Sequence, residues 1–281
     1  MGEPRWVVFG AGGMLGTDLV ATLQHAGHPV VALRHQDADI TDISSIRPHI
    51  RPGDIVANCA AYTRVDDAET HRDDAFALNA TGPANLARVC ADTGAKLVHY
   101  STDYVFGDAP FGIPIPVDAS YSPRCVYGES KMAGEIAVRD ILGDTALIAR
   151  VAWLYGAHGR NFVTTILTKL KTGQPLRVVN DQWGQPTWTQ EVSNSTVDLV
   201  LRGSAGTMHL TSKGSTSWFD FAAAIARLYG FDVDSVLPIS STEYPTPGKR
   251  PQWSVLAHQE HRASRPWIKS LESFTRSGFV L

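Results

Sequence analysis

The feature that most constrains the fold is an apolar run that ends in a cluster of glycines near the start of the chain. Residues 6–17 read WVVFGAGGMLGT, and four glycines, Gly10, Gly12, Gly13 and Gly16, fall within seven residues. Glycines let the backbone turn sharply and approach a ligand closely, and the first turn of a following helix presents its amides to an anion. Leucines repeat every fourth residue from 15 to 23, which predicts a helix, and a second apolar run follows at 29–33. We therefore predict a strand, a turn that binds a pyrophosphate, a helix and a second strand.

The end of the second predicted strand indicates which dinucleotide would bind. Sites selective for NAD carry an acidic residue there to hold the ribose 2′-hydroxyl, whereas this strand ends at Arg34. A guanidinium pairs well with a 2′-phosphate, so Arg34 favours NADP(H). The alternative is an ordinary solvated arginine at a strand end.

Composition excludes several classes of protein. The chain has 281 residues, 43% of them hydrophobic and 19% charged, which predicts a soluble globular protein with one large core and a second small one. The net charge of −3 and the scattered basic residues leave no footprint for nucleic acid or for an anionic membrane. No apolar run is long enough to span a bilayer and no leader precedes the first strand, so we expect a cytoplasmic protein. The three cysteines form no CxxC pattern, so we predict neither a disulfide framework nor a metal site.

Alternating strand and helix patterns continue to about residue 150. They predict an α/β fold with a doubly wound parallel sheet of the Rossmann type over residues 1–150. Residues 151–281 are less regular, and we expect a smaller α/β substrate domain there, with some segments returning to the first domain. The further predicted helices lie at about 44–50, 73–93, 127–143, 161–171, 192–201 and 218–229, and the further strands at about 55–60, 96–100, 145–150, 175–179 and 207–210. Five tryptophans in the second half would form a stacking surface or, as we expect for any one of them, core.

Tyr127 and Lys131 lie four residues apart and so share one face of a predicted helix. A free phenol titrates near pH 10, and a nearby ammonium favours the phenolate, which would give an acid/base group closer to neutral pH. Taken alone, this spacing is typical of a solvated helix face. The order along the chain favours catalysis, because a glycine turn comes first and a strand that runs out into Ser101 and Thr102 precedes the tyrosine.

Four motifs carry a resemblance to a known family. They are the glycine turn at 10–16, NCAAYT at 58–63, HYSTDYVF at 99–106 and YGESK at 127–131. Supporting stretches lie at 39–42, 65–69, 78–80, 159–163, 181–187 and 250–251. With these motifs the chain resembles the extended short-chain dehydrogenase/reductases and, within them, the dTDP-4-dehydrorhamnose reductase family. The resemblance covers almost the whole chain, and its most specific parts are STDYVF and YGESK.

The resemblance implies an NADPH-dependent oxidoreductase that reduces the C4 ketone of a dTDP-linked 4-keto-6-deoxy sugar in deoxysugar biosynthesis. It implies that Tyr127 donates a proton to the developing alkoxide, that Lys131 lowers the tyrosine pKa and binds the nicotinamide ribose, and that Thr102 hydrogen-bonds the carbonyl oxygen. The further cofactor contacts that it implies are Met14, Leu15, Asp39, Ile40, Ala60, Ala61 and Tyr62. The substrate contacts are Thr63, Val65, Thr102, Asp103, Tyr104, Trp153, Asn161 and Arg250.

Two segments depart from the family pattern: Arg124 to Val126 before the catalytic tyrosine, and Ala149 to Trp153 where relatives carry Arg-Thr-Ser-Trp. The acidic residues that hold magnesium in some relatives have no clear match, so no metal is predicted. A non-catalytic NADP-binding regulatory subunit and a sugar-nucleotide epimerase or dehydratase are the alternative functions. The former would not need Tyr127 and Lys131, and the latter would keep its cofactor through turnover. We expect a monomer or a homodimer.

Overall fold

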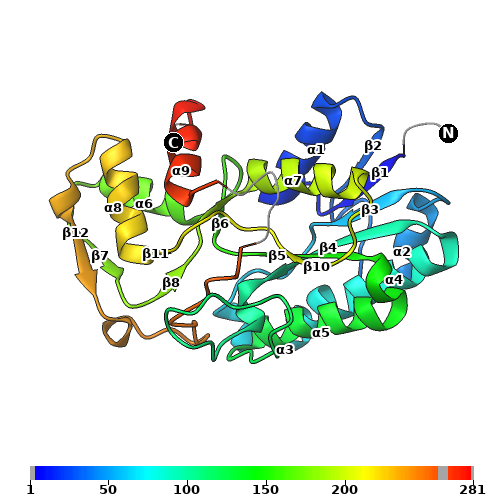
Figure 1. The fold of residues 1–281 in the computed structure, drawn as a ribbon, viewed down its shortest axis with the longest axis horizontal. Helices are drawn as coiled ribbons and strands as arrows, with labels where there is room; N and C mark the ends of the chain where they lie inside the picture. The colour runs from blue at the N-terminus through cyan, green and yellow to red at the C-terminus, as the bar shows by residue number, and fades with distance from the viewer. Residues whose placement is uncertain (1–3, 259–264, 280–281) are drawn as a thin grey trace.

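A six-stranded parallel sheet forms the centre of the larger part of the molecule (Figure 1). The computed structural model describes residues 4–258 and 265–279, so a few residues of each predicted domain lie outside the described ranges. The strand order is β10-β5-β4-β3-β1-β2, and the chain reverses its direction of travel across the sheet at β1. This arrangement confirms the predicted doubly wound α/β fold. The six strands are β1 (Trp6–Phe9), β2 (Val30–Leu33), β3 (Ile55–Asn58), β4 (Lys96–Thr102), β5 (Leu147–Val151) and β10 (Gly206–His209).

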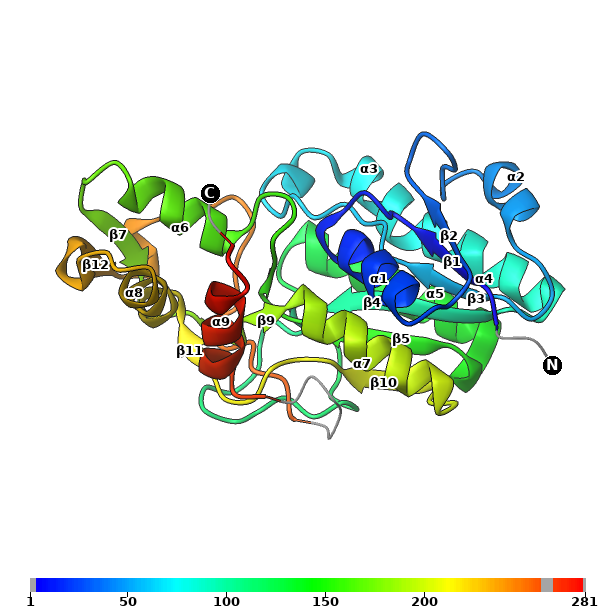
Figure 2. The same cartoon turned by 90° about the horizontal axis from the view of Figure 1, so that it is seen from above.

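Helices cover both faces of this sheet (Figure 2). On one face, α1 (Met14–His25) packs beside α7 (Thr189–Leu201), and on the other lie α2 (Ile43–Ile46), α3 (Arg72–Phe76), α4 (Gly82–Thr93) and α5 (Val126–Leu142). Successive side chains of a strand point to opposite faces, so Trp6 and Val8 pack under α1 and α7, whereas Val7 and Phe9 pack under α4. Alternate side chains of β1 thus contribute to two separate apolar cores, one on each face of the sheet.

A second, smaller unit has its own apolar core. It contains α6 (Phe162–Leu170), α8 (Trp218–Leu228), α9 (Trp267–Arg276) and the parallel pair β7 (Leu176–Val179) and β12 (Val236–Ile239). Two short pairs accompany it, β6 (Leu154–Tyr155) with β9 (Thr187–Trp188) and β8 (Trp183–Gly184) with β11 (Thr216–Ser217). The helix α7 and strand β10 belong to the layers of the larger unit although both follow residue 150. The division into domains at residue 150 stays a prediction.

One predicted helix differs from the observed one at a point near the site. The predicted helix at 73–93 is α3, a π-helical turn at Ala77–Thr81 and α4 in direct succession. A π-turn inserts an extra residue per turn and is frequent at functional sites. It carries the buried side chain of Asn79.

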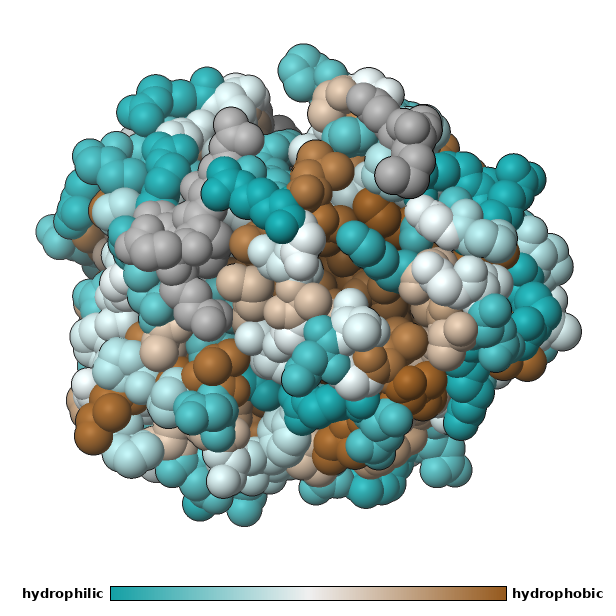
Figure 3. All heavy atoms as spheres, turned by 45° about the vertical axis from the view of Figure 1, so that its right-hand side comes forward, coloured by the Kyte–Doolittle hydropathy of each residue, from teal (hydrophilic) through white to brown (hydrophobic). Residues whose placement is uncertain are grey.

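Hydrophilic residues cover most of the face shown in Figure 3, and apolar residues gather around a hollow near its middle. None of the helices within residues 4–258 and 265–279 combines the length and the apolar character needed to cross a membrane.

Candidate active site

The glycine turn between β1 and α1 leaves no room for side chains. Gly10 has a φ of +74°, and a Cβ there would lie 2.5 Å from the backbone nitrogen of Ala60 on the neighbouring strand end. A Cβ on Gly16 would overlap the carbonyl oxygen of Gly10. Since only glycine fits at both positions, the turn stays tight and its amides stay open to a ligand.

A cavity of about 360 Å³ lies over this turn. Gly12 and Gly13 form its floor, and Arg34 borders it, with Cγ only 3.5 Å from the place of a Cβ on Gly12. The Arg34 side chain is exposed and so is accessible to an anionic ligand. Other predicted contacts that line this cavity are Gly10, Ile40, Ala60 and Ala61. A glycine cradle bordered by an arginine fits the diphosphate and 2′-phosphate of NADP(H).

Asp39 and Ile40 shape the loop at the edge of this cavity. The carboxylate of Asp39 accepts from the backbone N–H of Thr41 at 2.9 Å and from its hydroxyl at 2.8 Å. Ile40 is buried, and the amide of Asn85 on α4 donates to its carbonyl oxygen at 3.1 Å. The hydrogen bond from Asn85 therefore holds this loop, which lines the cavity, against α4.

Asn79 connects the predicted cofactor contact Tyr62 to α5, the helix that carries Tyr127 and Lys131. Its fully buried amide exchanges two hydrogen bonds with the backbone of Tyr62 and donates to the hydroxyl of Ser130 on α5 at 3.0 Å. Ser130 in turn donates to the carbonyl oxygen of Tyr127 at 2.8 Å. The sequence analysis assigned no role to Asn79. The only sign of its importance in the sequence was its place in LNA at 78–80, one of the stretches that support the family resemblance.

The end of β4 brings predicted substrate contacts next to Tyr127, the predicted proton donor. The hydroxyl of Thr102 donates to the carboxylate of Asp103 at 2.9 Å and accepts from the backbone N–H of Tyr104 at 3.2 Å. The rings of Tyr104 and Tyr127 meet edge to face at 5.5 Å. Asp103 is almost fully buried, and its Oδ2 atom has no hydrogen-bond partner in the part of the chain that the structure describes. Burial raises the pKa of this carboxyl to about 6.

Lys131 lies one helical turn after Tyr127 and is 2% exposed. Its ammonium donates to the carbonyl oxygen of Tyr100 at 2.6 Å, and burial lowers its pKa to about 8. Burial raises the pKa of Tyr127, which is the opposite of the direction expected from the ammonium alone. The largest cause is desolvation of the phenolate, and the nearby Asp103 acts in the same direction. The phenol is thus protonated at neutral pH, as a proton donor must be.

Trp153 is held in an unusual backbone conformation. Its φ of +44° is the only positive value of a non-glycine residue in the described ranges. Its ring stacks on Trp218 with centroids 3.4 Å apart and an angle of 5° between the planes, and Gly184 lies so close to the ring that a Cβ would overlap it. Such strain persists only where the surroundings enforce it and is frequent at ligand sites. Trp218 was predicted only as one of the tryptophans of the second half, and here it supports Trp153.

Arg250 forms a double ion pair with Asp66. Its two terminal nitrogens lie 2.7 and 2.8 Å from the two carboxylate oxygens, and the guanidinium lowers the pKa of Asp66. The loop that carries Arg250 packs on Val65, since a Cβ on Gly248 would lie 3.0 Å from the Val65 side chain. Thr63, two residues earlier, is exposed. The structure therefore brings Val65 and Arg250 together.

Arg250 also borders a second cavity, of about 290 Å³, between α6 and β7. Lys169 and Arg177 add two further cationic side chains to its lining. Phe162, Trp218 and Tyr244 supply aromatic surface. This mixture of cations and rings suits a nucleotide.

Asn161 caps α6 rather than pointing freely into either cavity. Its Oδ1 accepts from the backbone N–H of Thr164 at 3.1 Å, and its Nδ2 donates to the carbonyl oxygen of Gly156 at 2.8 Å and lies 3.6 Å from the sulfur of Met14. The N-terminus of α6 is thereby fixed against the start of α1.

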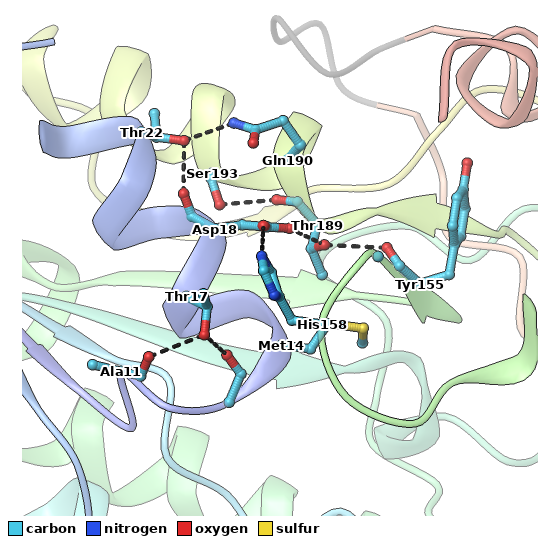
Figure 4. A network of polar contacts seen from close by, with 12 residues as sticks. Ala11, Met14, Thr17, Asp18, Thr22, Tyr155, His158, Thr189, Gln190 and Ser193 are labelled. Carbon is cyan, nitrogen blue, oxygen red and sulfur yellow. Dashed lines mark hydrogen bonds and ion pairs between the residues drawn. The ribbon is translucent and has the colours of Figure 1, made fainter. Parts of the chain in front are cut away.

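The loop at 156–161 is fastened to α1 by a second set of contacts (Figure 4). Asp18 on α1 is 6% exposed, accepts from the hydroxyl of Thr189 on α7 and lies 3.4 Å from the imidazole of His158 in the loop. Burial raises the pKa of Asp18. These contacts join the predicted cofactor helix to the segment that leads into the second cavity.

The sequence comparisons agree with this geometry. A family model described as the RmlD substrate binding domain matches residues 5–277. The chain belongs to this family. A "dTDP-4-keto-6-deoxy-D-glucose reductase" of Streptomyces niveus is 44% identical over 275 residues, which are 95% of this chain and 95% of the relative. A "dTDP-4-dehydrorhamnose reductase" of Streptomyces griseus is 42% identical over 286 residues, 97% of this chain and 93% of the relative.

A solved structure of another member has the same fold. The crystal structure of dTDP-4-dehydrorhamnose reductase from Bacillus anthracis, in complex with NADP, superimposes with a TM-score of 0.92 and 36% identity, covering 98% of this chain and 100% of that one. The resemblance to the extended short-chain dehydrogenase/reductases drawn from the motifs and the expectation of an oxidoreductase are confirmed. The individual cofactor and substrate contacts stay predictions.

Proposed function

We propose that this protein uses NADPH to reduce the C4 ketone of a dTDP-linked 4-keto-6-deoxy sugar in deoxysugar biosynthesis. The observation that carries the proposal is the hydrogen bond of 2.6 Å from Lys131 to the carbonyl oxygen of Tyr100, because it holds the helix face that carries Tyr127 against the end of β4, where Thr102 lies. In open α/β sheets the carboxyl ends of the strands are where ligands bind. The cavity over the glycine turn fits NADPH, and the cavity between α6 and β7, with its cationic side chains, fits the sugar nucleotide.

NADPH supplies the hydride when it is bound. The amides of the turn from Gly10 to Gly16 would hold its diphosphate, and Arg34 would hold its 2′-phosphate. Ala60, Ala61 and Tyr62 would border its flat rings, because small residues at the end of β3 leave room for them. Asp39 and Ile40 would contact it from the loop held by α4.

The side chains around the ketone would act on its oxygen. Thr102 and Tyr127 would both donate hydrogen bonds that strengthen as negative charge develops there, and Tyr127 would give up its proton to the alkoxide. Lys131 would hold the nicotinamide ribose and stabilise the tyrosinate that this transfer leaves behind. A phenol kept protonated by burial and a lysine ammonium beside it are suited to these two tasks.

The nucleotide end of the substrate would occupy the cavity between α6 and β7. Arg250, Lys169 and Arg177 would pair with the diphosphate, and the stacked pair of Trp153 and Trp218 would separate the sugar from the base. Thr63, Val65, Asp103 and Tyr104 would contact the sugar, and Asn161 would fix the N-terminus of α6 beside it. We further propose that the protein works in the cytoplasm, as a monomer or a homodimer and without a metal.

The test is to incubate the protein with NADPH and a dTDP-4-keto-6-deoxyhexose, with and without a 3,5-epimerase, and to identify the product by NMR. The proposal predicts a C4 alcohol and stoichiometric loss of NADPH. A substrate that is epimerised or dehydrated while NADPH is not consumed would point to another activity of the same fold. Comparison of the two incubations shows whether the epimerised sugar is required.

A further inference from the structure

A fully buried ion pair lies behind the catalytic lysine. Glu135 follows Lys131 by four residues on α5, so both side chains share one face of the helix, and Glu135 is 0% exposed. Arg150 on β5 is 2% exposed and donates to the carboxylate through Nε at 3.0 Å and Nη2 at 2.8 Å. A two-fold contact of this kind fixes both groups geometrically.

Other groups satisfy the remaining bonding capacity of the pair. The phenol of Tyr121 donates to Glu135 at 2.7 Å, and Arg150 donates to the carbonyl oxygen of Val117 at 2.7 Å. The guanidinium also lies over the rings of Phe106 and Tyr121, at 4.8 and 5.5 Å from their centroids. The imidazole of His209 faces it from β10 and stays neutral, because burial lowers its pKa to about 4.

A buried ion pair is a weak source of stability, because removing two charges from water offsets most of their attraction. A well-packed apolar pair would serve the fold equally well. The location of this pair therefore needs a different explanation, and Lys131 is a buried charged group one turn before Glu135 on the same helix.

We propose that Glu135 and Arg150 are positioning residues for the reaction: the carboxylate of Glu135, one turn from Lys131 on the same buried helix face, keeps the Lys131 ammonium charged, and Arg150 keeps Glu135 ionised. The inference rests on the proposed function only in taking Lys131 as catalytic. Lys131 meets one anion, Glu135, on its own helix, and the titratable His99 on β4. Tyr127 precedes it by one turn, and Arg150 stands behind the glutamate.

Both partners therefore support the ammonium. Glu135 raises the pKa of Lys131 against the effect of burial, so Glu135→Gln removes that support and leaves an unpaired Arg150 cation nearby. The pKa of Lys131 then falls. In Arg150→Gln the buried carboxyl of Glu135 loses the cation that lowers its pKa, so it takes up a proton and no longer supports the lysine, and the pKa of Lys131 falls as well.

The experiment measures the Lys131 pKa directly in the full-length protein, by NMR of protein labelled with 13C at the lysine Cε, with the resonance assigned through Lys131→Met. From the wild-type value of about 8 we expect a fall in both Glu135→Gln and Arg150→Gln, each of roughly one pH unit. The alkaline limb of the pH profile of kcat/KM should move to lower pH in both variants. Arg139→Gln is the matched control, since Arg139 is 3.9 Å from Glu135 and its side chain is 39% exposed.

Either single variant leaves a buried charge without its partner and is expected to lose stability. The double variant Glu135→Gln, Arg150→Gln keeps amide hydrogen bonds without either charge, so it serves if a single variant does not fold. Its Lys131 pKa should lie below that of the wild type, because burial then acts unopposed. An unchanged Lys131 pKa in Glu135→Gln or in the double variant would overturn the inference. The NMR titration needs no substrate, so it stands even if the proposed reaction fails its own test.

Discussion

The side chain of Asn79 and the backbone of Tyr62 are joined by two hydrogen bonds, one at 2.8 Å from the Tyr62 N–H and one at 3.0 Å to the Tyr62 carbonyl oxygen. A third bond leads from Asn79 to Ser130, one residue before Lys131. The predicted cofactor contact Tyr62, just after β3, and the face of α5 predicted to be catalytic therefore share one buried amide, carried by the π-helical turn.

Asn79→Ala should weaken both the fold and the reaction. It leaves the buried backbone N–H and carbonyl of Tyr62 without their partner and removes the donor to the Ser130 hydroxyl; an unsatisfied buried group costs about 1–3 kcal/mol. We expect a lower free energy of unfolding in urea and a lower kcat with NADPH and sugar nucleotide. Asn180→Ala, which changes an exposed asparagine, is the control. Equal stability of the two variants would show that the amide of Asn79 is dispensable.

Arg34→Asp should change the cofactor preference. The wild-type enzyme is predicted to prefer NADPH, because the guanidinium pairs with the 2′-phosphate, and an aspartate would repel that group and accept from a 2′-hydroxyl. The measurement is kcat/KM for NADPH and for NADH in both proteins. Arg51→Asp, in an exposed turn, controls for the change in net charge. Equal efficiency of the two cofactors in the wild type would contradict the assignment.

Arg250→Ala should act mainly on substrate binding. Charge-assisted hydrogen bonds contribute about 1.5–3 kcal/mol, so a contact with the diphosphate predicts a rise in KM for the sugar nucleotide of at least about tenfold and a smaller fall in kcat. Steady-state kinetics at saturating NADPH give both constants. The exposed Arg227→Ala should leave them unchanged. If Arg250 serves only to pair with Asp66, stability would fall while KM stays the same.

Asp103→Asn should alter how stability depends on pH. Burial raises the pKa of Asp103 from 3.8 to about 6, so the folded state holds a proton that the unfolded state releases between these values. Below pH 3.8 the carboxyl is protonated in both the folded and the unfolded state, so it does not affect stability. Above pH 6 its ionisation lowers the free energy of unfolding by about 3 kcal/mol. Relative to the wild type, the variant should gain stability as the pH rises from about 4 to about 7. Urea unfolding across this range measures it, with the exposed Asp140→Asn as a control whose difference from the wild type stays flat.

Local patterns predicted much of the fold. The glycine turn required positive φ and close approach at Gly10, so its position could be read directly from residue types. The spacing of Tyr127 and Lys131 defined one helix face, and the observed α5 begins at Val126 as expected. These features depend on a few consecutive residues, which is why the sequence alone reveals them.

Other features depend on contacts between distant segments, and no local pattern could show them. The partner of Arg150 is Glu135 on another element, and Arg250 pairs with Asp66, 184 residues away. The π-helical turn around Asn79 does not change the helical periodicity enough to be recognised. The direction of the Tyr127 pKa was expected wrongly, because charge spacing is visible in a sequence whereas desolvation is not.

The most direct measurement follows deuterium from NADPH that is labelled at C4 of the nicotinamide. With the wild-type protein and a dTDP-4-keto-6-deoxyhexose, NMR should find the deuterium at C4 of the product sugar. Tyr127→Phe, which keeps the ring and loses only the hydroxyl, should still bind NADPH but form this product at least roughly 100-fold more slowly, as expected for loss of a general acid. A product without deuterium at C4, or near-wild-type turnover in Tyr127→Phe, would contradict the account.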